Sequence, residues 1–345
     1  MVSQKNAAEK KLLRIAQIGV GYWGPNLLRN LISNTRCQVS RVVDASPERQ
    51  SYVNGLYPSV PTSADPADIF NDRDIDAVVL ATPLATHYDL AIKALSAGKH
   101  ILVEKPMATT VQEVEQIGAL ATQKGLVAMS GHTFLYNTAV RYVKGLIDSG
   151  DLGEIRYIYS QRLNLGRIRS DVDALWNFAP HDISIIQYWL HDDPPLAVHR
   201  HGMDFIQKGV DDVVFLNIMY PNKVMANIHV SWLDPHKIRR ITVVGSKKMV
   251  VYDDVADNKI AIYDKGIDRV ARLGENMDFD VPTPQTFNHR SGDVLLPQID
   301  FKEPLKVEID HFIDCVLNGT KCLTGIEHTL NVVRILAGAS GESSK

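Results

Sequence analysis

Leu13-Arg-Ile-Ala-Gln-Ile-Gly19-Val-Gly21-Tyr-Trp-Gly24 is the stretch that decides the fold of this chain. The apolar run predicts a buried strand over Leu13–Val20, and the G-x-G-x-x-G ending predicts the turn from that strand into a helix. Glycines Gly19, Gly21 and Gly24 would allow a tight turn, close approach of a pyrophosphate and close packing of helix on strand. The helix N-terminus then supplies N–H donors to phosphate. The stretch therefore predicts a dinucleotide-binding Rossmann domain.

The acidic residue that such a domain uses for the adenosine ribose is Asp44. It ends the second predicted strand, Gln38–Asp44, 20 residues after Gly24. A carboxylate there accepts hydrogen bonds from the ribose and repels a 2′-phosphate, so we expect NAD rather than NADP. Tyr22, Trp23 and Arg49 flank the loop and the acid, and we assign them to the same NAD site.

The order of predicted elements divides the chain into two domains. Strands at Ala77–Ala81, His100–Glu104 and Val127–Ser130 alternate with helices, which predicts a doubly wound parallel sheet in an NAD-binding domain over residues 1–130. Residues 131–345 are predicted to form an α/β domain for substrate binding and oligomerisation. Strands there follow one another without helices between them, which predicts a large, mostly antiparallel open sheet. Its predicted elements are the helices Asn137–Ser149 and Asp182–Leu190, the strands Ile155–Leu165, Val213–Tyr220, Val224–Trp232, Arg239–Gly245, Met249–Asp253 and Lys259–Tyr263, an irregular stretch Asp264–Lys302, and the closing helices Leu305–Leu317 and Glu327–Ala339.

Composition narrows the class of protein. Among 345 residues, 37 Lys and Arg balance 40 Asp and Glu, which argues against a nucleic-acid or anionic-membrane partner. The three cysteines lack C-x-x-C or C-x-x-H spacing and the histidines lack metal-ligand spacing, so we expect no metal and no disulfide framework. No apolar run is long enough to span a bilayer, and the N-terminal residues lack the apolar core of a signal peptide. The expected location is the cytoplasm.

Two tripeptides end predicted strands at the edge where a doubly wound sheet binds its ligand. Ala81-Thr82-Pro83 follows one strand, and Glu104-Lys105-Pro106 follows the next. Because ligands bind beyond the carboxyl ends of such strands, both tripeptides should border the cofactor. The proline after Lys105 stiffens the backbone that carries its ammonium group.

Over nearly its whole length the chain resembles the Gfo/Idh/MocA family of NAD(P)-dependent sugar and polyol oxidoreductases. The resemblance rests on the glycine fingerprint, Thr82-Pro83 with His87, Glu104-Lys105-Pro106, Gly131-His132…Asn137, the turn Asp148–Ile155, Pro180-His181-Asp182 and Glu308…Phe312…Gly319. It implies hydride transfer at a secondary alcohol carbon flanked by Lys105 and His181. It also implies a homodimer or homotetramer built through the second sheet.

The chain differs from the family pattern in the residues that precede the histidine. The family's histidine usually follows the pattern Asp-x-Gly-x-His, whereas this chain reads Asn177-Phe-Ala-Pro-His181. We predict His181 near the N-terminus of its helix, where the positive end of the helix dipole disfavours an imidazolium. Since neutral Asn177 gives no electrostatic support to His181, we expect Lys105 to act as acid–base and His181 to position the hydroxyl.

Aromatic and basic residues of the second domain suggest a nucleotide diphosphate. Aromatic rings and arginines can give stacking surfaces and charged forks for such a group. The sequence around Gly24 and His181 is most similar to that of family members that oxidise C3 of a UDP-linked amino sugar, such as UDP-N-acetylglucosamine, before transamination. A polyol or inositol 2-dehydrogenase and a non-catalytic dinucleotide sensor stay open as alternatives. The expected cofactor contacts are Gly19, Gly21, Tyr22, Trp23, Gly24, Asp44, Arg49, Thr82, Pro83, His87, Glu104 and Lys105, and the expected substrate contacts are Lys105, His132, Tyr136, Asn137, Arg162, Arg167, Arg169, Trp176, Asn177 and His181.

Overall fold

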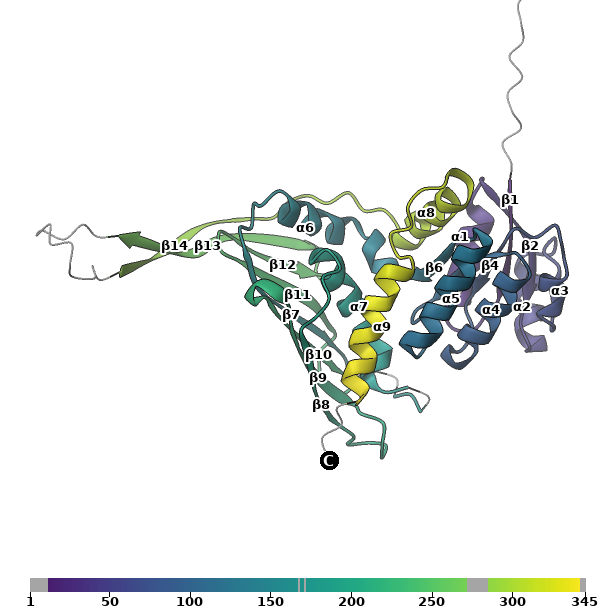
Figure 1. Ribbon diagram of the computed structural model, residues 1–345, viewed down its shortest axis with the longest axis horizontal. Coiled ribbons are helices and arrows are strands. Elements are labelled where there is room, and N and C mark those ends of the chain that lie inside the picture. The colour runs from purple at the N-terminus through teal and green to yellow at the C-terminus, as the bar shows by residue number, and fades with distance from the viewer. Residues whose placement is uncertain (1–11, 167, 171, 272–284, 342–345) are drawn as a thin grey trace, which may run out of the picture. The chain divides into compact units, whose positions relative to one another are not determined.

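The first sheet has the strand order of a Rossmann domain. The structure, a computed structural model, describes residues 12–166, 168–170, 172–271 and 285–341 (Figure 1). Six strands pair in the order β3-β2-β1-β4-β5-β6, and every pairing is parallel. The strands are β1 Leu13–Ile18, β2 Cys37–Val43, β3 Thr62–Ser63, β4 Ala77–Leu80, β5 His100–Glu104 and β6 Ala128–Gly131, and the helices between them are α1 Gly24–Ser33, α2 Pro47–Leu56, α3 Ala67–Phe70, α4 His87–Ser96 and α5 Val111–Lys124. The predicted doubly wound parallel sheet is confirmed.

Chain order in this sheet reverses direction at β1. The chain runs outward from β1 through β2 to β3, then returns to place β4 on the other side of β1. The carboxyl ends of β1 and β4 therefore border the switch point, where open α/β sheets bind their ligands. Fully buried Ile15 on β1 and Val78 on β4 hold the two strands between the helix layers.

The second sheet has eight strands in the order β14-β13-β12-β11-β7-β10-β9-β8. Only β7 and β10 pair in parallel among these described strands, so the predicted mostly antiparallel sheet is confirmed. Helix α7 packs on β7, β9 and β10, with Trp189 and Ile228 fully buried. Figure 1 shows β13 and β14 as a long hairpin at one end of this sheet. The strands are β7 Ile155–Leu163, β8 Ala197–Met203, β9 Val213–Met219, β10 Met225–Ser231, β11 Ile238–Gly245, β12 Met249–Asp253, β13 Ile260–Ala271 and β14 Gln285–Leu295, and the helices are α6 Thr138–Asp148 and α7 Ala174–Trp189.

Three expectations for this sheet were wrong. Helix α7 begins at Ala174, because Asp173 caps it by accepting the N–H of Trp176 at 2.9 Å. The expected irregular stretch contains β14 and the end of β13, which pair as a hairpin, and the side chains of residues 288–295 are mostly exposed. Strand β8 was missed because it is an edge strand whose residues alternate between half-buried and exposed.

The closing helices α8 (Pro304–Asn318) and α9 (Ile326–Gly341) divide between two compact units. The first unit holds the described residues up to Thr133 together with Glu303–Val333, and the second holds Phe134–Lys302 and the described residues from Arg334 onward. Helix α8 packs on α1, supported by a 2.5 Å ion pair between Arg36 and Asp314. These units differ from the expected division at residue 130, which placed Glu303–Val333 in the second domain.

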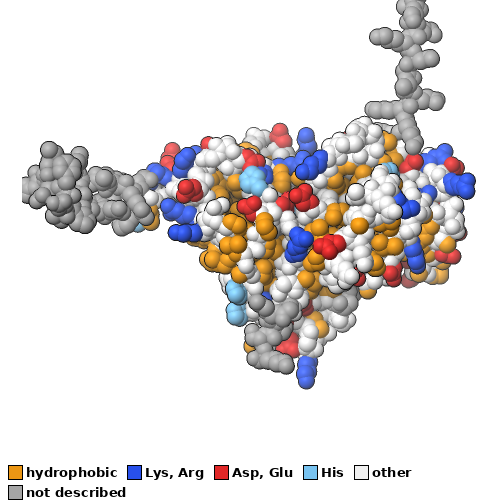
Figure 2. All heavy atoms as spheres, in the orientation of Figure 1, with side chains coloured by type: hydrophobic (Ala, Val, Ile, Leu, Met, Phe, Trp, Pro, Cys, Tyr) orange, Lys and Arg blue, Asp and Glu red, His pale blue; other side chains and the backbone are white. Residues whose placement is uncertain are grey.

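Surface charge is mixed in sign. On the face that Figure 2 shows, basic and acidic side chains lie interspersed among hydrophobic ones, in keeping with the formal net charge of −3. Among the described residues, no helix combines the length and apolar character needed to cross a membrane.

Candidate active site

The glycine loop between β1 and α1 is shaped by close contacts at two of its three glycines. Gly19 has a positive φ of 94°, and a Cβ built there would lie 2.5 Å from the carbonyl oxygen of Ala81. A Cβ on Gly24 would lie 2.5 Å from the carbonyl oxygen of Gly19. A Cβ on Gly21, in contrast, would meet no described atom within 4 Å beyond its chain neighbours. Gly21 therefore leaves open space on the side from which a pyrophosphate approaches.

A buried glutamine, which the sequence analysis missed, holds this loop closed. The Nε2 group of Gln17 donates to the carbonyl oxygens of Gly19 and Gly24, each at 2.9 Å. Gln17 lies on a strand that otherwise reads as apolar, and its side chain is fully buried. A buried polar residue in such a run was the available signal.

Asp44 lies beside the loop, as expected. Its carboxylate accepts the N–H of Val20 at 2.7 Å and the N–H of Ser46 at 2.9 Å. These two bonds fix the acid at the end of β2 and leave it further acceptor capacity for ribose hydroxyls. Arg49 is exposed on the first turn of α2, which Ser46 caps.

The two aromatic residues of the loop face solvent. Tyr22 is 91% exposed and Trp23 is 41% exposed, so neither belongs to the core. Trp23 hydrogen-bonds the Glu104 side chain, which connects the glycine loop to the end of β5. Tyr22 is available to stack on a planar ligand.

His87 holds the two tripeptides that follow β4 and β5. Its Nδ1 lies 2.8 Å from the carbonyl oxygen of Pro106, and its Nε2 lies 2.9 Å from that of Thr82. Burial lowers the pKa of His87, and the two carbonyls oppose that shift. Because the ring is 1% exposed, we assign it to holding Thr82-Pro83 and Lys105-Pro106 in place rather than to cofactor contact.

Glu104 and Lys105 form the centre of a polar cluster at the carboxyl end of β5. The Glu104 carboxylate accepts the backbone N–H of Lys105 at 3.2 Å. Burial raises the pKa of Glu104 to about 7, although the Lys105 charge and the hydrogen bonds from Lys105 and Trp23 oppose the rise. A carboxyl that titrates near neutrality next to a lysine is typical of sites that move protons.

Two further ionisable residues of the first unit belong to this cluster. Burial, with the nearby charges of His328 and Lys105, lowers the pKa of His132 well below its ordinary value. Burial, with the charge of Glu104, raises the pKa of Glu308 well above its ordinary value. The Glu308 carboxyl accepts the hydroxyl of Thr133 at 2.7 Å. Both shifts favour neutral forms. The sequence analysis missed the role of Glu308, because it lies far along the chain on α8.

In the second unit His181 lies in the middle of α7 and not at its start. Its ring packs edge-on against Phe134, with ring centroids 5.0 Å apart. The expected effect of a helix N-terminus on His181 was therefore wrong. Asn177 precedes it by one helical turn, so both residues lie on the same face of α7.

Arg162 forms a buried ion pair, so its guanidinium group is already occupied and does not bind a phosphate. Its Nε donates to Asp182 Oδ2 at 2.6 Å and its Nη2 to Asp182 Oδ1 at 3.3 Å. The guanidinium also lies over the Phe134 ring at 4.8 Å, and Asp182 accepts the Ser160 hydroxyl at 2.7 Å. Arg162 is 5% exposed, so the expectation that it binds a diphosphate is replaced by a structural role.

Some of the other expected substrate residues are buried or cap a helix, and others are exposed to solvent. Tyr136 is 1% exposed under the Arg141 guanidinium, and Asn137 caps α6 by accepting the N–H of Ala139 at 2.8 Å. Trp176 is half-buried and donates its indole N–H to Ser340 at 3.1 Å. Arg169 is exposed, and Arg167 lies outside the described residues.

Taken together, the first unit provides a glycine loop, an acid fixed beside it and a half-buried lysine–carboxyl pair at one sheet edge. Comparison with known proteins agrees with this arrangement. Residues 13–132 match the Gfo/Idh/MocA oxidoreductase family with its NAD-binding Rossmann fold, and residues 140–251 match the Gfo/Idh/MocA C-terminal domain. The chain belongs to the Gfo/Idh/MocA family. Its first unit is thus the NAD-binding Rossmann domain of that family.

Individual relatives of this Gfo/Idh/MocA chain differ in their names. An uncharacterised oxidoreductase of Escherichia coli, YdgJ, is 35% identical over 48% of this chain and 46% of its own length. The chain thus spans about half the length of the curated relatives it matches first. The scyllo-inositol 2-dehydrogenase (NAD⁺) of Bacillus subtilis is 25% identical over 93% of this chain and 91% of its own. The solved UDP-N-acetylglucosamine 3-dehydrogenase GnnA of Acidithiobacillus ferrooxidans shares the fold with a TM-score of 0.77, at 21% identity, over 95% of this chain and 97% of that one.

Proposed function

We propose that this protein is an NAD-dependent dehydrogenase that oxidises a secondary alcohol to a ketone. The observation that carries the proposal is the Glu104–Lys105 pair at the carboxyl end of β5, connected through Trp23 to the glycine loop. A protein that only senses a dinucleotide needs the loop and Asp44, but it has no need of a half-buried lysine–carboxyl pair beside them. That pair favours an enzyme over the sensor.

The reaction removes a hydride from the alcohol carbon and a proton from its hydroxyl group, and each needs its own acceptor. NAD⁺ held by the glycine loop and Asp44 would supply the hydride acceptor, and a side chain must accept the hydroxyl proton. The residues present fit NAD, because Gly21 leaves room for the pyrophosphate and Asp44 is fixed beside the loop. Glu104 lies next to Lys105, and burial biases its carboxyl and that of Glu308 toward the protonated form.

Lys105 is the residue that we assign to the proton. As a neutral amine it can accept the hydroxyl proton, and the adjacent Glu104 carboxyl, whose pKa burial raises to about 7, can exchange a proton near neutral pH. His181 packs against Phe134, and Asp182 beside it is occupied by Arg162 and Ser160. We therefore assign His181 to orienting the hydroxyl.

For the substrate we propose a nucleotide-linked sugar, specifically C3 of a UDP-linked amino sugar such as UDP-N-acetylglucosamine. The keto product is suited to transamination in the synthesis of cell-surface polysaccharide or lipid A. Support comes from the fold shared with the GnnA enzyme over most of both chains.

A second candidate is a polyol or inositol dehydrogenase. The ion pair between Arg162 and Asp182 removes one of the arginines that argued for a diphosphate. The inositol dehydrogenase also matches this chain over almost its full length. A neutral polyol carries no phosphate for arginines to bind. The Arg162–Asp182 ion pair therefore favours this second candidate.

The deciding experiment measures NADH formation at 340 nm with matched substrates. UDP-N-acetylglucosamine, free N-acetylglucosamine and scyllo-inositol are compared at equal concentrations, each with NAD⁺ and with NADP⁺. We expect turnover with the UDP-linked sugar and NAD⁺. Turnover of scyllo-inositol alone would support the second candidate. NAD⁺ binding without turnover, across a wider panel of sugar nucleotides and polyols, would support the sensor.

A further inference from the structure

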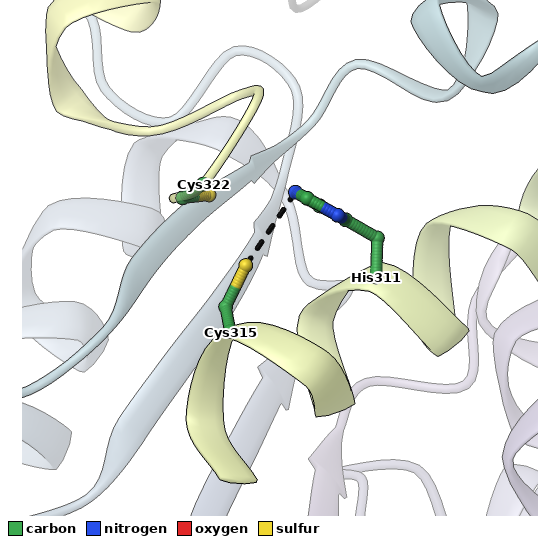
Figure 3. A group of neighbouring side chains, drawn as sticks. All are labelled: His311, Cys315 and Cys322. Atoms are coloured by element: carbon green, nitrogen blue, oxygen red, sulfur yellow. Dashed lines mark hydrogen bonds between the residues drawn. The ribbon is translucent and has the colours of Figure 1, made fainter. Parts of the chain in front are cut away.

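Three sulfur and nitrogen donors converge on the connection between α8 and α9, in a part of the first unit that the proposed chemistry does not use (Figure 3). His311 and Cys315 lie on α8, four residues apart and so on the same helix face. Cys322 lies in the segment between the two helices. The ligand atoms of the three side chains all lie within 4.8 Å of one another.

The spacing of these donors is close to that of a zinc site. A tetrahedral ion with Zn–S of about 2.3 Å and Zn–N of about 2.0 Å separates two ligand atoms by roughly 3.6 Å. His311 Nε2 and Cys315 Sγ are 3.4 Å apart. Cys322 needs only a small side-chain movement to complete the set.

The histidine already presents an unprotonated nitrogen to the Cys315 thiol. The N–H of Leu323 donates to His311 Nε2 at 3.0 Å, so that nitrogen acts as an acceptor and the ring proton is on Nδ1. The Cys315 thiol consequently donates to the same nitrogen. A metal ion would take the place of that thiol proton, and the Leu323 N–H could then donate to a thiolate.

Charge and access also suit a divalent ion. Two thiolates neutralise Zn²⁺ and the imidazole stays neutral, so the loaded site would carry no net charge beside the buried side chain of Cys315, which is 4% exposed. His311 and Cys322 are half-buried, which gives an entry path. The segment is anchored beside the edge strand β6, because Ser130 donates its N–H to Thr324 at 2.9 Å.

We propose that His311, Cys315 and Cys322 bind one zinc ion that joins α8 to the α8–α9 connection. Three protein ligands leave the fourth position to water. Sulfur and imidazole donors select zinc or copper(I) over magnesium or calcium, and zinc needs no redox partner. The sequence patterns C-x-x-C and C-x-x-H do not reveal this site, because its donors are a helical i, i+4 pair and a residue from the following loop.

The test is a Co²⁺ titration of the full chain, purified with reductant and chelator and then freed of both. We expect one Co²⁺ per chain, thiolate-to-cobalt absorption in the near ultraviolet, and its loss when Zn²⁺ is added. Cys322→Ser and His311→Gln should each bind Co²⁺ at least about tenfold more weakly, since a lost ligand costs no less than a lost supporting contact. Zn²⁺ should raise the melting temperature of the wild type and not that of Cys322→Ser.

Cys37→Ser is the matched control. Cys37 lies on β2, where its thiol donates to the Leu31 carbonyl at 3.3 Å, and the variant should bind Co²⁺ like the wild type. Circular dichroism checks that every variant is folded. An absent near-ultraviolet band, equal affinity in the folded Cys322→Ser variant, or a metal-free Cys315–Cys322 disulfide in protein isolated without reductant would each overturn the proposal.

Discussion

Lys105 and His181 are the two residues between which the proton assignment must be decided. A free lysine has a pKa of about 10.4, and lowering it to about 7–8 requires some 3–4 kcal/mol. Oxidised nicotinamide carries a positive charge that works in this direction, whereas Glu104 opposes it. We expect Lys105→Met to lower kcat about 10²–10⁴-fold, the usual effect of removing a general base, and His181→Asn to lower it clearly less. The pH dependence of kcat for both variants is the measurement.

Lys105→Arg separates the two roles that a lysine could have there. Arginine keeps the positive charge but does not give up its proton in proteins. It should therefore be as inactive as Lys105→Met if Lys105 exchanges the proton. An active arginine variant, or a larger loss in His181→Asn, would assign the proton to His181.

Glu104 makes stability depend on pH. Its folded pKa of about 7 lies above its ordinary value of 4.5, so between these values the folded protein holds a proton that the unfolded chain has lost. The free energy of unfolding should therefore fall as pH rises through that window, by about 3 kcal/mol if Glu104 titrated alone. Urea unfolding of Glu104→Gln at pH 5 and pH 8 should show a smaller fall than the wild type. Glu48→Gln on the exposed surface of α2 controls for the lost charge, and an identical fall in Glu104→Gln and the wild type would contradict the prediction.

At the scale of elements, the loop between β1 and α1 offers a contrast between two glycines. Gly21→Ala adds a methyl group that meets no described protein atom, so its melting temperature should match the wild type while NAD⁺ binding weakens. Gly24→Ala pushes a methyl group against the Gly19 carbonyl and should lower the melting temperature by several degrees. Calorimetry and NAD⁺ titration measure the two effects. Unchanged NAD⁺ affinity in Gly21→Ala would show that the pyrophosphate does not approach there.

The connection between β7 and α7 depends on the Arg162–Asp182 pair. Arg162→Met leaves the Asp182 carboxylate buried beside Ser160, which should cost about 3–5 kcal/mol of stability. The double variant Arg162→Met with Asp182→Asn should recover part of that loss, because no charge stays buried. Chemical denaturation measures both variants. If Arg162→Met kept wild-type stability and instead raised KM for a UDP-linked sugar, Arg162 would be a phosphate ligand after all.

The same elements show what a sequence can predict. Strands β1, β2, β4, β5 and β6 were predicted to within about two residues because they are apolar on both faces. The start of α7 was not, because the helix was predicted from Asp182 whereas the Asp173 cap places its start at Ala174. The loop residues around Asp44 could be inferred from local spacing. The contact of Glu104 with Trp23 and its charge interaction with Glu308 could not, because these residues are far apart in the chain.

At the scale of the whole molecule, one face of the second sheet carries exposed apolar side chains. Tyr157, Tyr159, Phe215, Met219 and Met225 are each 37–42% exposed, and the strand registers place them on the same face. A surface of this kind is typical of a contact between subunits. We therefore propose that the protein self-associates through this face as a homodimer or homotetramer.

Light scattering after size exclusion tests that assembly. The wild type should run at a multiple of 38.4 kDa, and the combined variant Tyr159→Glu with Phe215→Glu should run as a monomer. Leu56→Glu, at an exposed position on α2, should leave the mass unchanged. A monomeric wild type, or an assembly that survives both charges, would exclude this face.

Helix α9 begins in the first unit and ends in the second, and α8 belongs to the first although it follows the second sheet. The Phe134–Lys302 part of the second unit is thus inserted into the first, and the chain must return to complete the Rossmann domain. Because the domain includes Glu303–Val333, a ribosome must synthesise the chain as far as Val333 before the domain is complete. The same topology means that genetic excision should not cut at residue 130. An isolated NAD-binding fragment would need Thr133 spliced directly to Glu303.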